Sequence, residues 1–242
     1  MRAPKLVWVG AALAAGALAA APAAAGSFEI APTTIDLPSG GDRAVFYITN
    51  RGTEPVAVQI QGLDWRQTGG GEQLGASDML TVSPPVMRLL PERRQTVRLL
   101  IRRGATAGEQ NYRLLVSELP DPQSQASQRV RVLLQLSVPV FVAAAAPAPP
   151  HLAWSATRRP GGVALTARNG GARHAKLVDM FLVTSAGAKV AVAPNVISYV
   201  LAGASRRWVV ALPVPRPGET LRIEGRDDSD NAAVRAPVAI AP

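Results

Sequence analysis

The chain has 242 residues, of which 48% are hydrophobic, and it carries a formal net charge of +9 without a single cysteine. The missing cysteines exclude a disulfide framework, thiolate chemistry and cysteine-ligated metal sites. A positive charge is also typical of nucleic-acid binding, but here the arginines are scattered over strand-like segments and only 5% of the residues are aromatic. We therefore expect no nucleic-acid partner, and we interpret the charge as a basic surface suited to acidic partners.

Residues 1–25 have the layout of a secretory signal peptide. Arg2 and Lys5 form a short positive region, an apolar run follows over 6–18, and small residues lead to an expected cleavage site after Ala25. A single transmembrane anchor is the weaker alternative, because the run is rich in Ala and Gly and a strand-like segment follows it directly. No later segment is long and apolar enough to span a bilayer. We expect an exported, soluble protein without stable membrane insertion.

Residues 26–143 form a series of short strand-like runs separated by turn signals, which is typical of a β-sandwich. The expected strands are 28–30, 43–50, 56–60, 81–91, 95–102 and 112–116. Apolar side chains alternate along most of these runs, and the prolines of 81–91 indicate an edge position. The pattern predicts one sandwich domain over 26–143.

The most informative segment is 129–142, which we expect to form one strand of fourteen residues. Ordinary strands have about five or six residues. The alternate residues of this segment share one apolar face: Val130, Val132, Leu134, Leu136, Val138 and Val140. Pro139 cannot donate a ladder hydrogen bond, which indicates an edge position or a strand end. Because proteins usually avoid long apolar edge strands, we infer that pairing with another chain is the purpose of this one.

Residues 144–150 are rich in alanine and proline and are expected to form a linker with restricted freedom. Beyond the linker, 151–242 carries a second, weaker series of strand-like runs punctuated by glycines. No stretch of the chain shows sustained helical periodicity of apolar residues. The predicted fold is therefore all-β, with two β-sandwich domains.

Residues that carry catalysis or bind metals are nearly absent. The two histidines, His151 and His174, have no metal-ligand partner at helical or turn spacing, so both are expected at the surface. The acidic turn 227–231 lacks the glycine and the distal glutamate of a calcium loop, and we prefer a solvated hairpin turn to a calcium site. For Trp65 and Trp208 we prefer core packing to sugar binding. We expect no enzyme activity, no metal and no cofactor.

Five segments in order along the first domain resemble the periplasmic pilus-assembly chaperones of chaperone–usher systems. These segments are 44–50, 83–91, 95–99, 112–120 and the long strand with its ending at 139–142. The second domain matches more loosely, through 167–170 and 199–203. The Val-Pro-Val-Phe-Val ending of the long strand is most similar to the archaic branch, which includes Csu-type and spore-coat-type pili. The resemblance implies two immunoglobulin-like domains in an L-shaped, boomerang-like arrangement and a location in the periplasm.

The resemblance also implies a function for the long strand. Pilus subunits are incomplete immunoglobulin-like folds that lack their last strand, and the chaperone fills the resulting groove by donor-strand complementation. The expected donor side chains are Val130, Val132, Leu134 and Leu136, with Val138 as a further member. Burying four such side chains would contribute about 6–12 kcal/mol before ordering costs. The alternative is that each of these residues faces only the core of its own domain.

Well-studied members of the family anchor the C-terminal carboxylate of the subunit with an arginine and a lysine. These positions correspond to Thr34 and Pro139 here, so the anchor must differ or be absent. Arg113 and Arg98 are the two candidates, because we expect them on neighbouring strands, facing away from the inward apolar set. A guanidinium in such a position can bind a carboxylate through two hydrogen bonds.

The same resemblance gives Arg98 a competing structural role. The family uses this arginine and the position of Glu118 in an interdomain ion-pair network. Its third member, an arginine, corresponds to Ala143 in this sequence. We therefore expect a structural ion pair between Arg98 and Glu118 without the third member.

The partners implied by the resemblance are pilus subunits and an outer-membrane usher, and the free protein would be a monomer or a self-capped dimer. Two other classes of protein stay open. A structural pilus subunit or adhesin would usually have a single domain and an N-terminal donor extension, for which 26–32 is too short. A secreted sugar-binding β-sandwich protein, or an enzyme, would need clustered exposed aromatic residues or a catalytic constellation, and the sequence contains neither.

Overall fold

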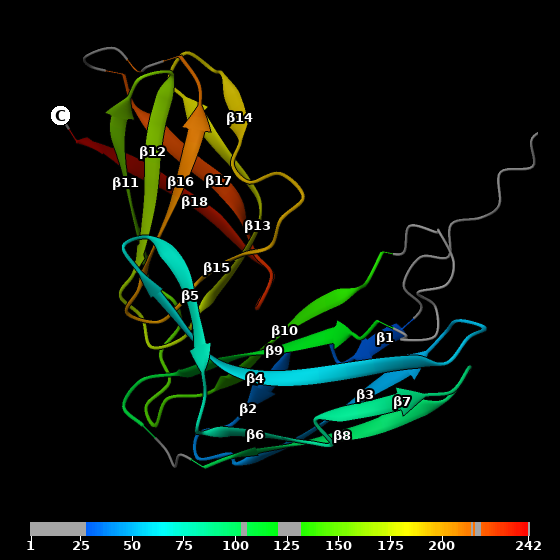
Figure 1. Cartoon of the computed structure of the whole chain (residues 1–242). Coiled ribbons are helices and arrows are strands. Elements are labelled where there is room, and N and C mark those ends of the chain that lie inside the picture. Colours follow the sequence, from blue (N-terminus) through cyan, green and yellow to red (C-terminus); the bar gives the residue numbers. More distant parts are fainter. Residues whose placement is uncertain (1–27, 103–105, 121–131, 214, 216–218, 242) are drawn as a thin grey trace, which may run out of the picture.

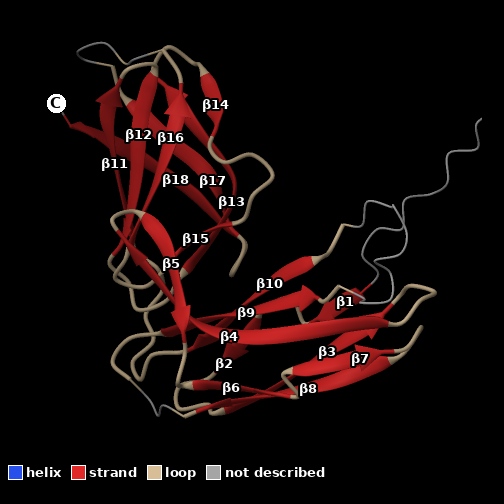
Figure 2. Ribbon diagram, in the orientation of Figure 1, coloured by secondary structure: helices blue, strands red, loops and turns tan. Residues whose placement is uncertain are grey.

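The computed structural model describes residues 28–102, 106–120, 132–213, 215 and 219–241 (Figure 1). The predicted signal peptide lies outside these ranges. Within them every regular element is a strand (Figure 2), and no helix there is long and apolar enough to cross a membrane. The strands form two lobes that meet at one end and enclose an open angle, so the molecule is L-shaped (Figure 1). The predicted all-β fold with two sandwich domains is confirmed.

The first domain is a sandwich of two sheets. One sheet has the strand order β1 (Phe28–Ala31), β3 (Arg43–Asn50), β8 (Arg94–Ile101) and β6 (Leu80–Ser83). The other has the order β2 (Ile35–Leu37), β10 (Gln135–Val142), β9 (Gln110–Glu118), β4 (Val56–Thr68) and β5 (Gly71–Ala76), with β7 (Val86–Leu89) also paired to β4. The chain thus changes sheets between β1 and β2.

The core of the first domain forms where alternate side chains of the two sheets meet. Phe46 and Ile48 of β3 belong to the same cluster as Leu114 of β9 and Val140 of β10. All four side chains are 0% exposed. Alternation along a strand sends successive side chains to opposite faces, so these strands present their other faces away from this core.

The second domain contains the remaining strands. Their order is β14 (Lys189–Ala191), β13 (Ala175–Thr184), β17 (Leu221–Asp227), β18 (Ala232–Ala241), β11 (Leu152–Arg159), β12 (Gly162–Asn169) and β16 (Ser205–Ala211), with β15 (Ser198–Val200) also paired to β13. In its core the rings of Trp154 and Trp208 stack with centroids 6.0 Å apart. The predicted core packing of Trp208 is confirmed.

The long strand is shorter than predicted. We expected one strand over 129–142, whereas β10 begins at Gln135. Residues 132–134 are described without strand structure, and 129–131 lie outside the described residues. The neighbouring strand β9 ends at Glu118, which is opposite position 134, so β9 offers no further backbone partner to the preceding residues.

The two histidines have different surroundings. His151 is exposed, as predicted, but His174 is 5% exposed, so its predicted surface position is wrong. Its ring is covered by Phe141 and Glu109 of the first domain, which no local sequence pattern links to it. The segment 227–231 forms the predicted hairpin turn between β17 and β18. No group of His, Cys, Asp and Glu suited to a metal ion occurs in the part of the chain that the structure describes.

Candidate functional site

The first five residues of β10 have a free edge. β9 pairs antiparallel with the whole of β10, Gln135–Val142. On the opposite side, β2 pairs in parallel with residues 140–142 alone. Among the strands that the structure describes, residues 135–139 therefore have one neighbour, and their other edge borders the open angle between the domains (Figure 1). Such an edge presents unpaired N–H and C=O groups to another chain.

The hydrogen-bond pattern shows which backbone groups face the free edge. The N–H of Glu118 donates to the carbonyl oxygen of Leu134 at 2.8 Å, so the Leu134 backbone points toward β9. The N–H of Ala143 donates to the carbonyl oxygen of Leu37 in β2 at 3.0 Å, in the opposite direction. Because the direction alternates along the strand, even-numbered residues of β10 bond to β9 and odd-numbered residues point outward. Pro139 is odd-numbered, so its missing N–H removes no bond from the sheet.

The predicted donor side chains become more exposed toward the beginning of the segment. Val138 is 3% exposed and belongs to the core of its own domain. Leu136 and Leu134 are half-buried at the margin of that core. Val132 is 74% exposed, and Val130 lies outside the described residues. The core of the first domain therefore covers one end of this row and leaves the other end uncovered.

Polar side chains hold the opposite face of the same segment against β9. The Gln135 side-chain amide donates to Ser117 Oγ at 2.8 Å, and Arg113 Nη1 donates to Ser137 Oγ at 3.5 Å. These contacts join β10 to β9 outside the core. They fix the strand at one edge while its other edge stays free.

Arg113 is a partly buried cation beside the free edge, opposite Pro139 in the pairing of β9 with β10. Its guanidinium lies 3.7 Å from the centroid of a Trp65 ring and 5.2 Å from the Tyr199 ring. Burial lowers the pKa of Arg113 and the charge of Glu72 raises it, but an arginine remains protonated at physiological pH. None of the ion pairs within the described ranges includes Arg113. Its charge therefore has no direct carboxylate partner there.

Arg98 and Arg113 lie in different sheets of the first domain. Arg98 belongs to β8, in the other sheet of the sandwich, so the prediction that Arg98 and Arg113 lie on neighbouring strands is wrong. The predicted ion pair between Arg98 and Glu118 does not form either, because the Arg98 side chain is exposed and directed away from the core. Glu118 is 8% exposed and accepts a hydrogen bond from the Leu134 N–H at 3.3 Å, so it holds the residue preceding β10.

A buried aromatic cluster joins the two domains, and we call it the junction cluster: Trp65, Phe141, Tyr199 and Leu201. The Trp65 ring centroid lies 5.8 Å from that of Phe141 and 5.3 Å from that of Tyr199. The predicted packing of Trp65 is confirmed, although its partners come from both domains. Because Phe141 is part of β10, the second domain fixes the end of the strand whose beginning is free.

Polar groups complete this junction. The Gln67 side chain donates to the Tyr199 carbonyl oxygen at 2.8 Å and accepts from the Leu201 N–H at 3.0 Å. The carboxylate of Glu109 accepts from the His174 backbone N–H at 2.9 Å and lies 3.0 Å from His174 Nδ1. Sequence reasoning missed Gln67 and Glu109, because their partners lie in the other domain and neither residue belongs to a local motif.

The position aligned with the family's arginine also lies at the junction. Burial raises the pKa of Tyr199, and the charge of Lys176, the neighbouring Thr34 side chain and the charge of Arg113 oppose this rise. The hairpin of β4 and β5 adds an ion pair of 2.9 Å between Glu72 and Arg206 of the second domain. The C-terminal end of β10 thus lies at a junction where several contacts join the two domains.

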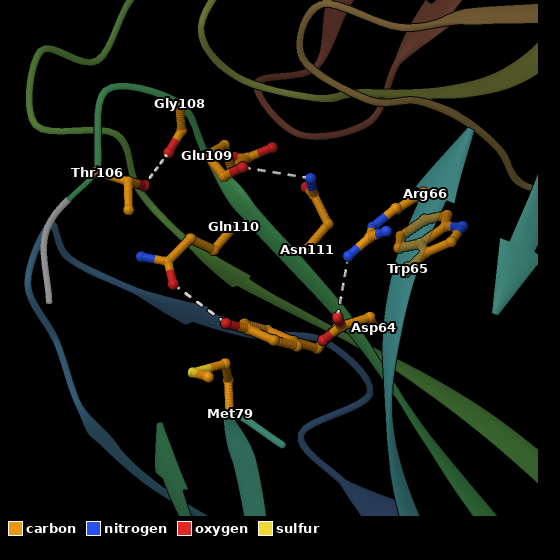
Figure 3. A pocket seen from close by; sticks show the side chains of 10 residues that line it. Asp64, Trp65, Arg66, Met79, Thr106, Gly108, Glu109, Gln110 and Asn111 are labelled. Atoms are coloured by element: carbon orange, nitrogen blue, oxygen red, sulfur yellow. Dashed lines mark hydrogen bonds and ion pairs between the residues drawn. The ribbon is translucent and has the colours of Figure 1, made fainter. Parts of the chain in front are cut away.

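A cavity of about 340 Å³ lies at this end of the first domain (Figure 3). Its lining residues are Asp64, Trp65, Arg66, Met79, Thr106, Gly108, Glu109, Gln110, Asn111 and Tyr112. Its charged groups are already engaged, since Arg66 lies 3.3 Å from Asp64 and Glu109 binds His174. We assign no binding role to this cavity.

Residues 27–147 match the family model for the N-terminal domain of PapD, described as a pili and flagellar-assembly chaperone. The match spans half of the chain. This protein therefore belongs to the family of pilus-assembly chaperones. The resemblance found in the sequence is confirmed, and the family is not enzymatic. Among curated proteins, no relative matches the sequence.

Several solved structures share the fold. One is the CsuC–CsuE chaperone–tip adhesion subunit pre-assembly complex from archaic chaperone-usher Csu pili of Acinetobacter baumannii, with a TM-score of 0.70, 21% identity, and coverage of 89% of this chain and 100% of that chain. The E. coli chaperone DraB has a TM-score of 0.61, 17% identity, and coverage of 89% and 97%. The Pseudomonas aeruginosa CupB2 chaperone has a TM-score of 0.56, 14% identity, and coverage of 88% and 100%. The similarity to the Csu structure is consistent with the predicted archaic branch.

Proposed function

We propose that this protein is exported to the periplasm, where it folds, stabilises and caps pilus subunits and delivers them to an outer-membrane usher. The observation that carries the proposal is the free edge of residues 135–139, along which a partly covered row of apolar side chains runs. Donor-strand complementation is a known form of β-strand addition, in which backbone bonds supply the pairing and side-chain pockets set the register. A division into a signal peptide (1–25), a first domain (26–143), a linker (144–150) and a second domain (151–242) belongs to this proposal.

The backbone of β10 limits where a subunit strand pairs. Gln135 and Ser137 each offer an outward N–H and C=O, whereas Pro139 has no N–H and its outward C=O faces β2, whose pairing begins at Val140. Beyond Pro139, β2 already occupies the edge. The ladder with the subunit therefore ends near Pro139 and extends in the other direction, toward Val132 and Val130.

The side chains differ in what they contribute. Complete burial of an aliphatic side chain contributes about 1.5–3 kcal/mol. Val132, which is 74% exposed, has the most surface to bury, and the half-buried Leu134 and Leu136 have less. Val138 is already buried in its own domain, so its main role is to hold the strand in place.

We also propose that Arg113 anchors the C-terminal carboxylate of the subunit. Its guanidinium lies over the Trp65 ring and near the Tyr199 ring, beside the free edge and without a carboxylate partner in the described ranges. A guanidinium in this position can form two charge-assisted hydrogen bonds to a carboxylate. The other candidate, Arg98, is on the opposite sheet and is too remote from β10 for this role.

Co-purification from the periplasm with tagged pilus subunits of the same bacterium tests the proposal. The test variant is Val132→Arg/Leu134→Arg, and the control is Val209→Arg, because Val209 of β16 is 73% exposed, close to the 74% of Val132. We expect wild type and control to hold a subunit in a 1:1 complex, and the test variant to lose it while circular dichroism shows a folded protein. A folded test variant that keeps its subunit would contradict the donor-strand role. Failure of wild type to capture any subunit would contradict the chaperone function.

The free edge also supports a self-capped dimer, in which residues 135–139 of two copies cover each other. We expect sedimentation of the free protein to show a monomer–dimer equilibrium. Adding a subunit should shift this equilibrium to the 1:1 chaperone–subunit complex. A dimer that persists while a subunit is bound would show that it forms through another surface.

A further inference from the structure

The second domain presents an apolar loop to the open angle between the domains. Residues 193–197 connect β14 to β15, and this loop projects from the second domain into the open angle on the side of β10 (Figure 1). Val196 and Ile197, the last two residues of the loop, are 58% and 51% exposed. The loop contains no charged residue. Apart from the exposed polar side chain of Asn195, it therefore offers an uncharged, apolar surface to this space.

The ends of the loop are fixed although its tip is exposed. Val192 is 2% exposed, and its N–H bonds to a carbonyl oxygen of β13 at 2.8 Å. Ser198 is 3% exposed and pairs with Leu177 of β13. Between them, the Val196 N–H closes a turn onto the loop's first carbonyl oxygen at 3.3 Å. A surface that is already ordered loses less conformational entropy when it binds.

The loop backbone is also strained. Ala193 has a φ of 49° and Asn195 a φ of 59°, both in the left-handed region. This region is unfavourable for alanine because its Cβ crowds the following carbonyl oxygen. Such conformations persist where the surrounding structure imposes them, and they are frequent at binding sites.

Exposed large aliphatic residues that are adjacent in sequence occur at two places in the described ranges. One is Val196 and Ile197 in this loop, and the other is Val132 and Leu133, which are 74% and 42% exposed and precede β10. The other exposed aliphatic residues, such as Val209, have no such neighbour. One pair belongs to each domain: that of the first domain precedes β10, and that of the second domain belongs to the loop that projects into the open angle (Figure 1). Apolar surfaces on both sides of an angle suit a single body that fills it.

We propose that the 193–197 loop is a second contact surface for the pilus subunit, against which the subunit rests while β10 holds it. This inference rests on the proposed function, and it adds a contact that strand donation itself does not require. The loop lies across the open angle from the donor interface, and its chemistry selects an apolar, uncharged patch on the subunit. The loop slows the dissociation of the complex.

Dissociation kinetics of the purified 1:1 complex test the inference. Val196→Asp/Ile197→Asp is compared with Val209→Asp, a control that places one carboxylate at an exposed valine of the same domain. We expect dissociation from the loop variant to be about ten- to hundredfold faster than from wild type, and dissociation from the control to be unchanged. Equal rates for the loop variant and wild type would overturn the inference. Equal acceleration in the control would overturn it as well.

Photo-crosslinking gives a second measurement that does not depend on destabilising the loop. A photoreactive amino acid at position 197 is expected to crosslink to the subunit, and one at position 209 is not. If Val132→Arg/Leu134→Arg abolishes capture but position 197 yields no crosslink in wild type, the proposed function stands and this inference fails. If wild type captures no subunit, the proposed function fails, and the inference fails with it.

Discussion

The two ends of the donor segment have the same alternating sequence and opposite surroundings. Val140 and Val142 lie between β9 and β2 and are 0% exposed. Leu134 and Leu136 are on the same face but are half-buried beside a free edge, and Val132 is 74% exposed. The alternation in the sequence therefore decides on which face of the strand a side chain lies. The neighbouring strand decides whether that face belongs to a closed core or stays open to a partner.

The largest expected effect is on the free energy of unfolding, which a charged substitution should lower at the buried end of the segment but not at the exposed end. Val140→Asp should unfold the first domain at a cost above about 4 kcal/mol, because a carboxylate at this buried position has no partner. Val132→Asp should change the free energy of unfolding by less than about 0.5 kcal/mol. Urea denaturation followed by tryptophan fluorescence measures both. Similar losses in the two variants would show that the ends of the segment do not differ.

Two proline substitutions, at neighbouring positions of β10, test which backbone N–H groups face the free edge. Leu136→Pro removes a bond to β9 together with a half-buried side chain, at an expected cost of about 2–4 kcal/mol. Ser137→Pro removes an outward N–H, so we expect little change in stability and weaker subunit capture. Urea denaturation and co-purification measure the two effects. A Ser137→Pro variant that is the less stable of the two would show that the assigned direction is reversed.

The next effect concerns the anchor. We expect Arg113→Ala to weaken subunit binding by about ten- to hundredfold, as expected for losing hydrogen bonds to a charged group. Arg113→Lys should have an intermediate effect, because it keeps the charge but loses the planar fork and the stacking on Trp65. Calorimetric titration with the subunit measures both. Arg98→Ala is the control on the other sheet, and an equal loss there would contradict the assignment of Arg113.

The smallest effect lies in the second domain, away from the donor segment. Lys176 pairs with Asp228 at 3.0 Å, and this hydrogen bond lowers the pKa of Asp228 from 3.8 and raises the pKa of Lys176 from 10.5. The contribution to stability is thus present between these two values. It is lost as the pH falls through the lowered pKa of Asp228 or rises through the raised pKa of Lys176.

Thermal unfolding of wild type and Asp228→Asn across pH measures this contribution. We expect a small difference in melting temperature that is constant from about pH 5 to about pH 9 and disappears in strong acid. A difference that grows as the pH falls would contradict the assigned sign. Because Asp228 is exposed and Lys176 is half-buried, added salt should reduce the difference.

Local patterns predicted the strands well where the apolar alternation is regular. The strand expected over 43–50 is β3, Arg43–Asn50, and the expected 112–116 lies inside β9, Gln110–Glu118. The pattern failed at 129–142, because the length of a strand also depends on where its neighbour ends. The edge position indicated by the prolines of 81–91 is confirmed, but the pattern did not show that this segment contributes β6 to one sheet and β7 to the other.

Site residues were predictable to different degrees. Val132, Leu134 and Leu136 follow from alternation alone, and the structure leaves them incompletely covered. Arg98 and His174 were misplaced, because the sheet to which a strand belongs and the domain that covers a side chain depend on contacts between residues distant in sequence.

The sequence by itself determined the absence of disulfides, the all-β character, the apolar row that begins at Val130 and the resemblance to pilus-assembly chaperones. These properties depend on composition and on the period of side chains along the chain, which are local. The tertiary structure alone decided that β2 covers residues 140–142 and leaves 135–139 free, and that Gln67 joins the domains through Tyr199. The physical reason is that a free edge is a property of strand order, and strand order is set by pairing between distant segments.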